Sequence, residues 1–473
     1  MQQNETQLDP QPTTTDWRQG SLLELTITDL NHQGDGVGRW NSRVVFVPGT
    51  VVGDRILARL LHVKPNIGHG KLQELLEESP QRIRPRCIVA DKCGGCQWQH
   101  MDYGAQQTAK FNQVVQNLER IGGFENPPVS PLLPLLSEEP DADLHYRNKS
   151  TYPLGRSHIG QVQAGYYRQG SHQLVNLNQC PIQDPRLDPL LAEIKQDIHE
   201  QKWSIYNEEK HRGKLRHLSL RIGRRTGEML VTLVTASSGL PNLTEQAKVW
   251  MERYPNLVGV LLNYNPDRTN AIFGADTDVV LGREYLRETF AGLEFQIHPT
   301  TFFQVNTEQA EALLNAVLEE LQLTGNEVVV DAYCGVGTLT LPIAQRVQRA
   351  IALEVQREAV TQAQQNAEIN SISNVTFLTG TVEKLLPELM EQPDIVLLDP
   401  PRKGCDRTVL ETLRSQQPER IVYLSCNPST LARDLKVLCE AGLYELKRVQ
   451  PADFFPQTTH VECAAFLQRV GKS

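Results

Sequence analysis

Apolar and polar side chains alternate in short stretches over the first eighty positions, and turn-forming residues separate these stretches. Residues 22–30, 43–47 and 55–63 carry apolar side chains with the two-residue period of a strand that has one buried face. Several short strands of this kind, separated by Gly, Asn and Asp, are typical of a small β-barrel. No helical pattern follows the glycine-rich segment 34–38, so we interpret it as a turn and not as a phosphate-binding loop.

The last third of the chain has a different pattern, in which apolar, β-branched runs alternate with amphipathic helical segments. The runs at 328–331, 350–354, 394–399 and 420–424 are continuous apolar stretches, as expected of strands buried on both faces. A helix is predicted to start after Asn306, because a good capping residue precedes an apolar pattern of helical period. This alternation predicts a doubly wound α/β domain with a parallel sheet.

Strand-like and helical patterns are mixed between these two regions. Runs at 217–222, 229–234 and 257–263 predict strands, and helical segments between them indicate an α+β domain. The first residues of the chain are polar and rich in Gln and Thr. We therefore predict four parts: a disordered tail at 1–15, a barrel at 16–79, a central α+β domain at 80–290 and an α/β domain at 291–473.

Composition supports a multidomain protein of the ordinary globular kind. The chain has 473 residues, of which 40% are hydrophobic and 22% charged, and this length exceeds what one core supports. We find neither a signal peptide nor an apolar stretch long enough to span a bilayer, so we expect a cytoplasmic protein with reduced or metal-bound cysteines. The net charge of −9 argues against a basic coat protein, but basic patches such as 210–217 leave nucleic-acid binding open.

A glycine-rich loop follows the first strand of the α/β pattern. Asp331 ends this strand, Gly335 and Gly337 lie in the loop, and Glu354 ends the second strand. Two glycines let a backbone approach a ligand closely, and a carboxylate at the end of the second strand can accept hydrogen bonds from both ribose hydroxyls. The dinucleotide fingerprint and the P-loop lysine are both missing. The arrangement resembles that of class I S-adenosylmethionine-dependent methyltransferases; the alternative is a tight turn that binds no ligand.

A proline-rich loop and a cysteine follow the next two strands. The segment 399–404 begins with Asp399 and two prolines, which stiffen the loop and remove backbone donors. Enzymes that methylate amino groups of bases often carry an aromatic residue where this chain has Arg402. Cys426 stands at the end of the next strand, where a thiolate is a strong nucleophile. The change at position 402 and the added thiol point to carbon as the methyl acceptor.

The chemistry of a pyrimidine explains why a thiol is needed. C5 of uracil is too weakly nucleophilic to take a methyl group directly, whereas addition of a thiolate at C6 makes C5 carbanion-like. A base must then remove the proton from C5 so that the thiol can leave. Glu462, at the start of the last apolar strand, is the candidate base. From spacing alone, an acid at the end of a strand with no catalytic role explains Glu462 equally well.

Taken together, residues 299–473 resemble the catalytic domain of the RNA 5-methyluridine methyltransferases. The matching segments are 302–306, 331–337, 399–404, 425–434 and 460–462. The resemblance implies that Cys426 is the nucleophile and Glu462 the general base, and that S-adenosylmethionine is the methyl donor. Threonine stands at two of the cofactor positions, 338 and 381, where some family members carry asparagine. The residues at the cofactor positions are Gln304, Tyr333, Gly335, Gly337, Thr338, Glu354, Thr381 and Asp399.

Four cysteines outside the α/β domain form a candidate metal site. Cys87, Cys93 and Cys96 lie within ten positions, and Cys180 follows much later. By spacing alone, four such thiolates suit a zinc ion and an iron–sulfur cluster about equally well. The arrangement resembles the [4Fe–4S] site in the ribosomal-RNA branch of the family, and the barrel resembles a TRAM domain, an OB-like RNA-binding module. The resemblance thus implies a [4Fe–4S] cluster and 23S ribosomal RNA as partner. We expect a monomer with no membrane association and no obligatory protein partner.

Three other functions fit part of the pattern. A transfer-RNA uracil-C5 methyltransferase would use the same catalytic residues, although that branch of the family generally lacks both the barrel and the cysteine cluster. An enzyme that methylates amino groups of nucleic acid would not need Cys426. An iron–sulfur RNA-binding protein with a relict methyltransferase domain would bind RNA without turnover, but Asp331, Glu354, Cys426 and Glu462 are all intact.

Overall fold

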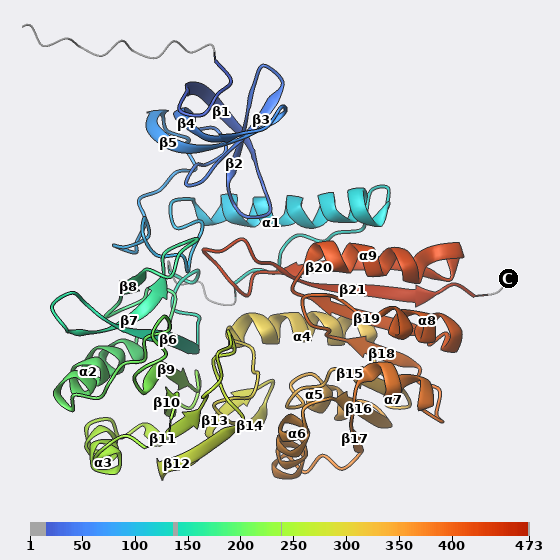
Figure 1. Cartoon of the computed structure of the whole chain (residues 1–473). Helices are drawn as coiled ribbons and strands as arrows, with labels where there is room; N and C mark the ends of the chain where they lie inside the picture. Colours follow the sequence, from blue (N-terminus) through green and yellow to red (C-terminus); the bar gives the residue numbers. More distant parts are fainter. Residues whose placement is uncertain (1–15, 136–140, 238, 472–473) are drawn as a thin grey trace, which may run out of the picture. The chain divides into compact units, whose positions relative to one another are not determined.

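The computed structural model of the chain describes residues 16–135, 141–237 and 239–471 (Figure 1). The chain divides into two compact units. The predicted tail at 1–15 lies outside the described residues. In the described ranges, no helix is both long enough and apolar enough to pass through a membrane. The first unit comprises Met1–Ala90, Cys96–Ala109 and Gln457–Thr459, and the second comprises Asp91–Gly95, Lys110–Pro456 and His460–Ser473.

The first unit contains a closed barrel of five strands in the order β1-β2-β3-β5-β4. Alternate residues of β1 and β4, among them Leu23, Leu25 and Ile56, are fully or almost fully buried, so the two-residue period places one face of each strand inside the barrel. The predicted β-barrel is confirmed. Its strands are β1 (Leu22–Leu30), β2 (Gly36–Trp40), β3 (Arg43–Val47), β4 (Arg55–Val63) and β5 (Ile67–Glu77).

The glycine-rich segment 34–38 is only partly the predicted turn. Gly34 lies in the turn with φ of +89°, but β2 begins at Gly36 and includes the rest of the segment. A side chain at Gly36 would place its Cβ 2.0 Å from Oγ1 of Thr50. The glycine is therefore required by close packing within the barrel, a cause that the sequence pattern does not distinguish from a turn.

The central domain of the second unit is built on a seven-stranded mixed sheet in the order β12-β11-β10-β9-β6-β7-β8. Only β10 and β11 pair in parallel, and the remaining pairs are antiparallel. The α+β architecture follows the mixed pattern of the sequence. The elements are β6 (Lys149–Arg156), β7 (Val162–Tyr167), β8 (Leu174–Asn176), α2 (Leu187–Glu200), β9 (Leu215–Ile222), β10 (Met229–Thr235), α3 (Leu243–Arg253), β11 (Leu257–Tyr264) and β12 (Asp276–Gly282).

A second seven-stranded sheet forms the C-terminal domain, in the order β17-β16-β15-β18-β19-β21-β20. The strands from β15 to β19 are parallel, whereas β21 runs antiparallel to both β19 and β20. The predicted doubly wound fold is confirmed. The strands are β15 (Val328–Ala332), β16 (Arg349–Glu354), β17 (Val375–Thr379), β18 (Ile395–Leu398), β19 (Arg420–Ser425), β20 (Tyr444–Ala452) and β21 (Glu462–Arg469).

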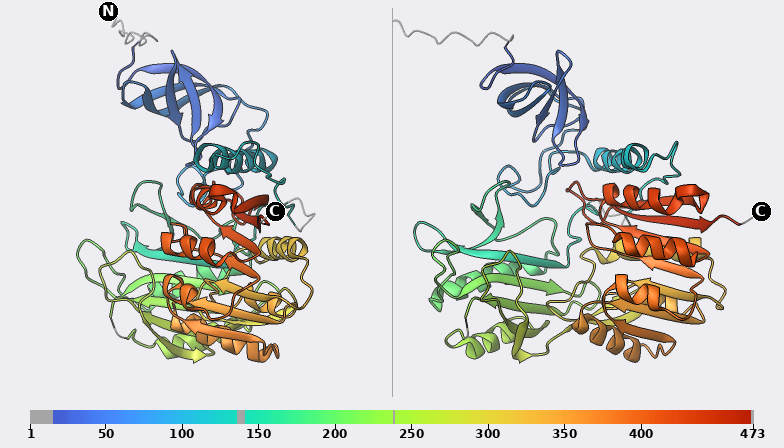
Figure 2. Two further views of the ribbon diagram at one scale, coloured as in Figure 1. Left: turned by 90° about the vertical axis from the view of Figure 1, so that its right-hand side faces the viewer. Right: turned by 45° about the vertical axis from the view of Figure 1, so that its right-hand side comes forward.

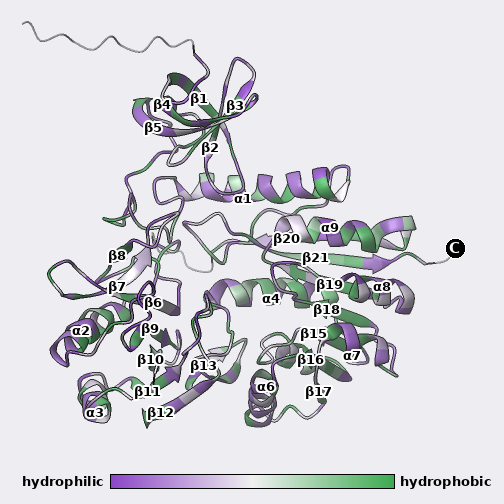
Figure 3. Ribbon diagram, in the orientation of Figure 1, coloured by the Kyte–Doolittle hydropathy of each residue, from purple (hydrophilic) through white to green (hydrophobic). Residues whose placement is uncertain are grey.

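Helices cover both faces of this sheet (Figure 2). One face packs against α4, α5 and α6, and the other against α7, α8, α9 and α1. The central strands are mostly apolar because both faces are covered, and green predominates along them in Figure 3. The helices are α1 (Tyr103–Asn117), α4 (Thr307–Leu321), α5 (Thr340–Ala344), α6 (Arg357–Ile369), α7 (Val382–Glu388), α8 (Arg407–Gln416) and α9 (Pro428–Cys439).

The connections fix where a ligand can bind. From β15 the chain crosses to β16 on one side, and β18 pairs with β15 on the other side. The strand order therefore reverses at β15, and loops after β15 and β18 separate to leave a crevice at their carboxyl ends. Asn306 caps α4 as predicted, because its Oδ1 accepts a hydrogen bond from the backbone N of Gln309 at 3.1 Å. The hairpin of β13 (Leu286–Phe290) and β14 (Leu293–Ile297) precedes this helix.

Candidate active site

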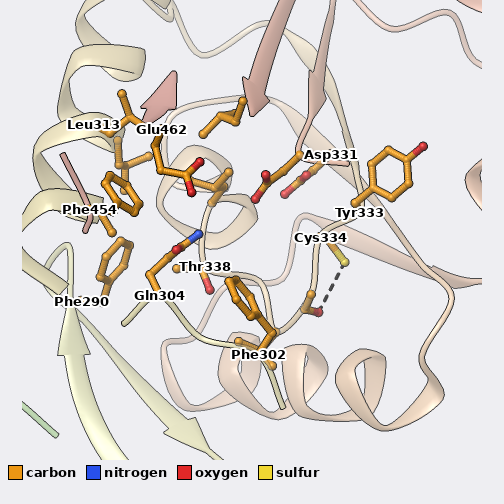
Figure 4. Close-up of a pocket in the computed structure, with 17 residues that line it drawn as sticks. Phe290, Phe302, Gln304, Leu313, Asp331, Tyr333, Cys334, Thr338, Phe454 and Glu462 are labelled. Carbon is orange, nitrogen blue, oxygen red and sulfur yellow. Dashed lines mark hydrogen bonds between the residues drawn. The ribbon is translucent and has the colours of Figure 1, made fainter. Parts of the chain in front are cut away.

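A cavity of about 640 Å³ opens at the carboxyl ends of β15 and β18 (Figure 4). This volume includes space that is open to solvent. Acidic side chains share the cavity with an apolar wall, so it suits a ligand with both polar and apolar parts. The lining residues are Phe290, Phe302, Gln304, Ala310, Leu313, Leu314, Asp331, Tyr333, Cys334, Gly335, Val336, Thr338, Leu339, Asp399, Leu424, Phe454 and Glu462.

Asp331 presents an unsatisfied carboxylate oxygen to this cavity. Its side chain is 1% exposed, and its Oδ2 accepts a hydrogen bond of 2.5 Å from Oγ1 of Thr340. Its Oδ1 has no hydrogen-bond partner among the described residues. Burial raises the pKa of Asp331 to about 7, and the negative charges of Asp399 and Glu354 act in the same direction. A buried polar atom without a partner is costly, so a donor from a bound ligand would complete this site.

Glu354 forms a hydrogen bond with the loop after β15. Its Oε2 accepts a hydrogen bond from the backbone N of Gly335 at 3.1 Å, and its Oε1 accepts one from Gln356 at 2.8 Å. Gly337 has φ of +87°, and a Cβ there would lie 3.1 Å from Cγ of Leu341. Tyr333 adopts φ of +75°, which is strained for a residue other than glycine, and its ring points away from the cavity in Figure 4.

The segment before α4 forms another wall, and residues of the central sheet hold it. Arg221 of β9 is 4% exposed, and its Nη1 donates to the carbonyl oxygen of His298 at 2.7 Å and to that of Thr301 at 3.2 Å. Nδ2 of Asn148 donates to the carbonyl oxygen of Gln304 at 2.8 Å. The central domain therefore shapes the part of the cavity that carries Gln304.

Asp399 and Glu462 also line the cavity, and burial raises the pKa of each carboxyl group. Burial raises the pKa of Asp399 to about 6. It raises the pKa of Glu462 to about 8, and the charge of Asp399 adds to this effect while Arg402 opposes it. Glu462 is therefore largely protonated at neutral pH, and its proton is held weakly enough for acid–base chemistry near pH 8.

Cys426 follows β19, and the charges of these two acids act on its thiol. The thiol is half-buried, and burial raises its pKa, with Glu462 and Asp399 adding to the rise and Arg402 opposing it. The next residue, Asn427, caps α9 through a hydrogen bond of 3.1 Å from the backbone N of Ser429 to its Oδ1. Asn427 Nδ2 also donates to the carbonyl oxygen of Arg402 at 3.2 Å, so the cysteine and the proline loop are linked.

The structure places most of the predicted cofactor residues at the cavity. Gly337, Glu354, Thr381 and Cys426 do not line it, although Glu354 contacts its loop and Cys426 interacts with its acids. Sequence reasoning missed the apolar lining, because residues such as Phe290 and Leu313 have the same pattern as core residues. The predicted set that does line the cavity is Gln304, Tyr333, Gly335, Thr338, Asp399 and Glu462.

The four candidate metal-binding cysteines do not form a metal-binding group among the described residues. Among residues 16–135, 141–237 and 239–471, no group of three or more His, Cys, Asp or Glu side chains is placed to hold a metal ion. Cys93 and Tyr166 both lie close to Gly95, and Tyr166 in turn interacts with Cys180. A Cβ on Gly95 would lie 3.5 Å from Sγ of Cys93 and 3.6 Å from the ring of Tyr166, and Cys180 interacts electrostatically with Tyr166.

Comparisons with known proteins agree with this geometry. The profile of the tRNA (uracil-5-)-methyltransferase family matches residues 142–470, and that of the TRAM domain matches residues 16–72. An uncharacterized RNA methyltransferase of Nostoc sp. is 63% identical over 96% of this chain and 98% of its own. A second one, of Synechocystis sp., is 60% identical over 96% and 97% of the two chains.

A solved structure extends the comparison to three dimensions. The tRNA (uracil-54, C5)-methyltransferase of Pyrococcus abyssi, in complex with S-adenosyl-L-homocysteine, superposes with a TM-score of 0.74 at 29% identity. The match covers 94% of this chain and 99% of that one. The chain therefore belongs to the tRNA (uracil-5-)-methyltransferase family and is an S-adenosylmethionine-dependent RNA methyltransferase that acts on C5 of uracil.

Proposed function

We propose that the protein methylates C5 of a uridine in 23S ribosomal RNA through a covalent bond between Cys426 and C6 of the base. The observation that carries this proposal is the meeting of Asp331, Asp399 and Glu462 at one cavity, with the thiol of Cys426 within the electrostatic reach of the last two. A flipped uracil ring would enter between the cavity and the thiol.

The proposed donor fits the residues that are present. When bound, S-adenosylmethionine supplies an electrophilic methyl group on a positively charged sulfur. Asp331 offers its unsatisfied Oδ1 to a hydrogen-bond donor of this molecule, and Glu354 and Gln304 are the candidate residues for its ribose and its remaining polar groups. Phe290, Phe302 and Leu313 supply the apolar wall. The S-adenosyl-L-homocysteine bound to the Pyrococcus abyssi enzyme supports the same assignment.

The proposed reaction starts from Cys426 as a thiolate and Glu462 as a carboxylate, both of which have released their protons to solvent. The thiolate of Cys426 forms a bond to C6, and the electrons of the C5–C6 double bond move to C5 and the neighbouring carbonyl. C5 accepts the methyl group, and the electrons of the broken sulfur–methyl bond stay on sulfur to give S-adenosylhomocysteine. Glu462 takes the proton from C5, the double bond re-forms, and Cys426 departs as a thiolate.

Transfer RNA is the second candidate substrate. The matching family profile and the Pyrococcus abyssi enzyme both carry transfer RNA in their names. The proposal for ribosomal RNA rests instead on the joint presence of the TRAM domain and the four cysteines. The two candidate substrates can be distinguished by which RNA forms a covalent adduct with the enzyme.

The test uses RNA that contains 5-fluorouridine. Fluorine cannot leave C5 as a proton does, so the enzyme, S-adenosylmethionine and the true substrate should give an adduct that survives a denaturing gel. Fragments of 23S ribosomal RNA are compared with transfer RNA, and Cys426→Ser is the control. An adduct on transfer RNA alone would overturn the ribosomal proposal. Methylation of unmodified RNA without any adduct would overturn the role of Cys426.

We also propose that Cys87, Cys93, Cys96 and Cys180 hold a [4Fe–4S] cluster that orders RNA-binding loops. The short spacing of the first three thiols supports it, and so does the electrostatic interaction of Cys180 with Tyr166, which lies near Gly95 and Cys93. The methyl-transfer scheme needs no electrons, so no catalytic step depends on the cluster. Protein purified without oxygen should be brown and contain about four irons per chain. Stoichiometric zinc and no colour would show a zinc site instead.

A further inference from the structure

The amide of Asn427, directly after the proposed nucleophile, serves two segments at once. Its Oδ1 accepts a hydrogen bond from the backbone N of Ser429 at 3.1 Å, which caps α9. Its Nδ2 donates to the carbonyl oxygen of Arg402 at 3.2 Å. The Oγ1 of Thr430 donates to the same carbonyl at 3.3 Å. A capping residue needs only the first of these bonds, so the second requires another explanation.

The rest of the proline loop is tied to the same helix. Nη2 of Arg433 donates to the carbonyl oxygen of Lys403 at 2.9 Å, and the backbone N of Cys405 donates to Oδ2 of Asp434 at 2.9 Å. Gly404 has φ of +79°, and a Cβ there would lie 2.5 Å from Oδ2 of Asp434. Asn427 and the first two turns of α9 therefore hold the loop after Asp399 through hydrogen bonds to Arg402, Lys403 and Cys405.

The guanidinium of Arg402 lies near His460. Its Nη2 is 3.5 Å from Nε2 of His460, and its charge acts on Cys426 and Glu462 as well as on His460. Arg402 itself is exposed, so packing does not immobilise its side chain. The bonds to its carbonyl oxygen therefore fix the backbone position from which the charge of Arg402 acts on the thiol.

We infer that Asn427 is a positioning residue for the methyl-transfer reaction: it anchors Arg402 so that the guanidinium favours the thiolate form of Cys426. The inference rests on the proposed function, because it assumes that Cys426 is the nucleophile. Arg402 supplies positive charge at a thiol that burial and two acids otherwise keep protonated. Asn427 touches no reacting atom and acts through the loop.

The substitution Asn427→Ser separates the two bonds of the amide. Serine is a good capping residue, so α9 keeps its N-terminal acceptor, whereas a serine side chain is too short to replace the donor to the carbonyl of Arg402. The variant also leaves the local charge unchanged. Arg402→Met removes the guanidinium directly, and Arg407→Met, on the exposed surface of α8, controls for the loss of one positive charge.

The first measurement is the rate at which iodoacetamide alkylates Cys426 between pH 6 and pH 10, followed by mass spectrometry of the peptide that contains it. Loss of a favourable positive charge raises the pKa of a thiol, so Asn427→Ser and Arg402→Met should both shift the midpoint to higher pH. The alkylation rate at pH 7.5 should fall about tenfold, which corresponds to a midpoint shift of about one pH unit. Arg407→Met should behave as the wild type.

The second measurement is adduct formation with 5-fluorouridine RNA under single-turnover conditions. The double variant should be no slower than Arg402→Met alone, because Asn427 acts through Arg402. Additive losses, or an alkylation profile of Asn427→Ser that matches the wild type, would overturn the role of Asn427. A change confined to the KM for RNA would show instead that Arg402 only binds the substrate. If the wild type forms no adduct while it methylates unmodified RNA, the nucleophile itself is refuted and this role with it.

Discussion

Nζ of Lys110 lies 2.6 Å from Oδ1 of Asp453, and neither side chain has any exposed surface. Lys110 also donates to the carbonyl oxygen of Phe455 at 3.1 Å, and the backbone N of Phe455 donates to Oδ1 of Asp453 at 3.0 Å. This buried pair brackets Phe454, which lines the active-site cavity. An ion pair between α1 and the segment after β20 thus supports a wall of the donor site.

Removing one member of this pair should therefore affect both stability and donor binding. We expect Lys110→Met to destabilise the second unit by about 3–5 kcal/mol, because it leaves the Asp453 carboxylate buried without its counter-charge. Thermal unfolding and the KM for S-adenosylmethionine are the measurements. The double variant Lys110→Met with Asp453→Leu should recover much of the lost stability. If it is less stable than either single variant, the lost packing and not the buried charge explains the effect.

The pH dependence of the complete reaction, from the addition of Cys426 to the release of methylated RNA, should follow the protonation of Cys426 and Glu462. The pKa of each group is raised, that of Glu462 to about 8, and each must lose its proton before it can act. The single-turnover rate should therefore rise with pH from about 6 to about 9. Quench experiments over this range with saturating donor and RNA provide the measurement. A rate that is constant below pH 8 would contradict the roles of both groups.

The substitution Glu462→Gln should trap the enzyme after methyl transfer. Glutamine keeps the size of the side chain but cannot take the proton from C5, so Cys426 remains bonded to C6. We expect a denaturing gel to show an adduct with ordinary RNA that contains the transferred methyl group, and turnover to fall by about 10²-fold or more. Cys426→Ser gives no adduct and is the control. Normal turnover by Glu462→Gln would assign the base to another residue.

Binding of S-adenosylhomocysteine should tighten as Asp331 ionises. The pKa of Asp331 is raised to about 7, so its carboxylate form, which accepts hydrogen bonds most strongly, predominates above that pH. Calorimetry at pH 6 and pH 8 should show tighter binding at the higher pH. Asp331→Asn should weaken binding about 10- to 100-fold at pH 8 and remove the pH dependence. Glu391→Gln, an exposed acid in a surface ion pair, is the matched control.

Arg221 links the central sheet to the cavity wall that carries Gln304, and its loss should raise the KM for S-adenosylmethionine. Nη1 and Nη2 both donate to the carbonyl oxygen of Thr301, and Nη1 also donates to that of His298. Arg221→Met leaves these carbonyls unsatisfied, so we expect a loss of about 3 kcal/mol of stability and an increase of about tenfold in KM. Arg221→Lys should have a stability and a KM between those of the wild type and Arg221→Met. An unchanged KM in a destabilised Arg221→Met enzyme would show that the contact is only structural.

Local patterns predicted the elements of the fold better than they predicted the site. The period of the apolar residues was enough for the barrel and the parallel strands, because burial of one or both faces imposes that period directly. The same rule could not assign Gly36, whose role depends on Thr50 across the barrel. It also could not separate the apolar wall of the cavity, such as Leu314, from the core, because both are apolar residues on covered faces.

Residues that are close along the chain were enough to predict the barrel, the α/β fold, the loops after Asp331 and Asp399, and a thiol at the end of a strand. Only the tertiary structure decided the electrostatics. The raised pKa of Glu462 comes from burial and from Asp399, and the opposing charge of Arg402 depends on a loop held by Asn427. Burial and charge act through space, so side chains from three different strands and loops set the chemistry of this site together.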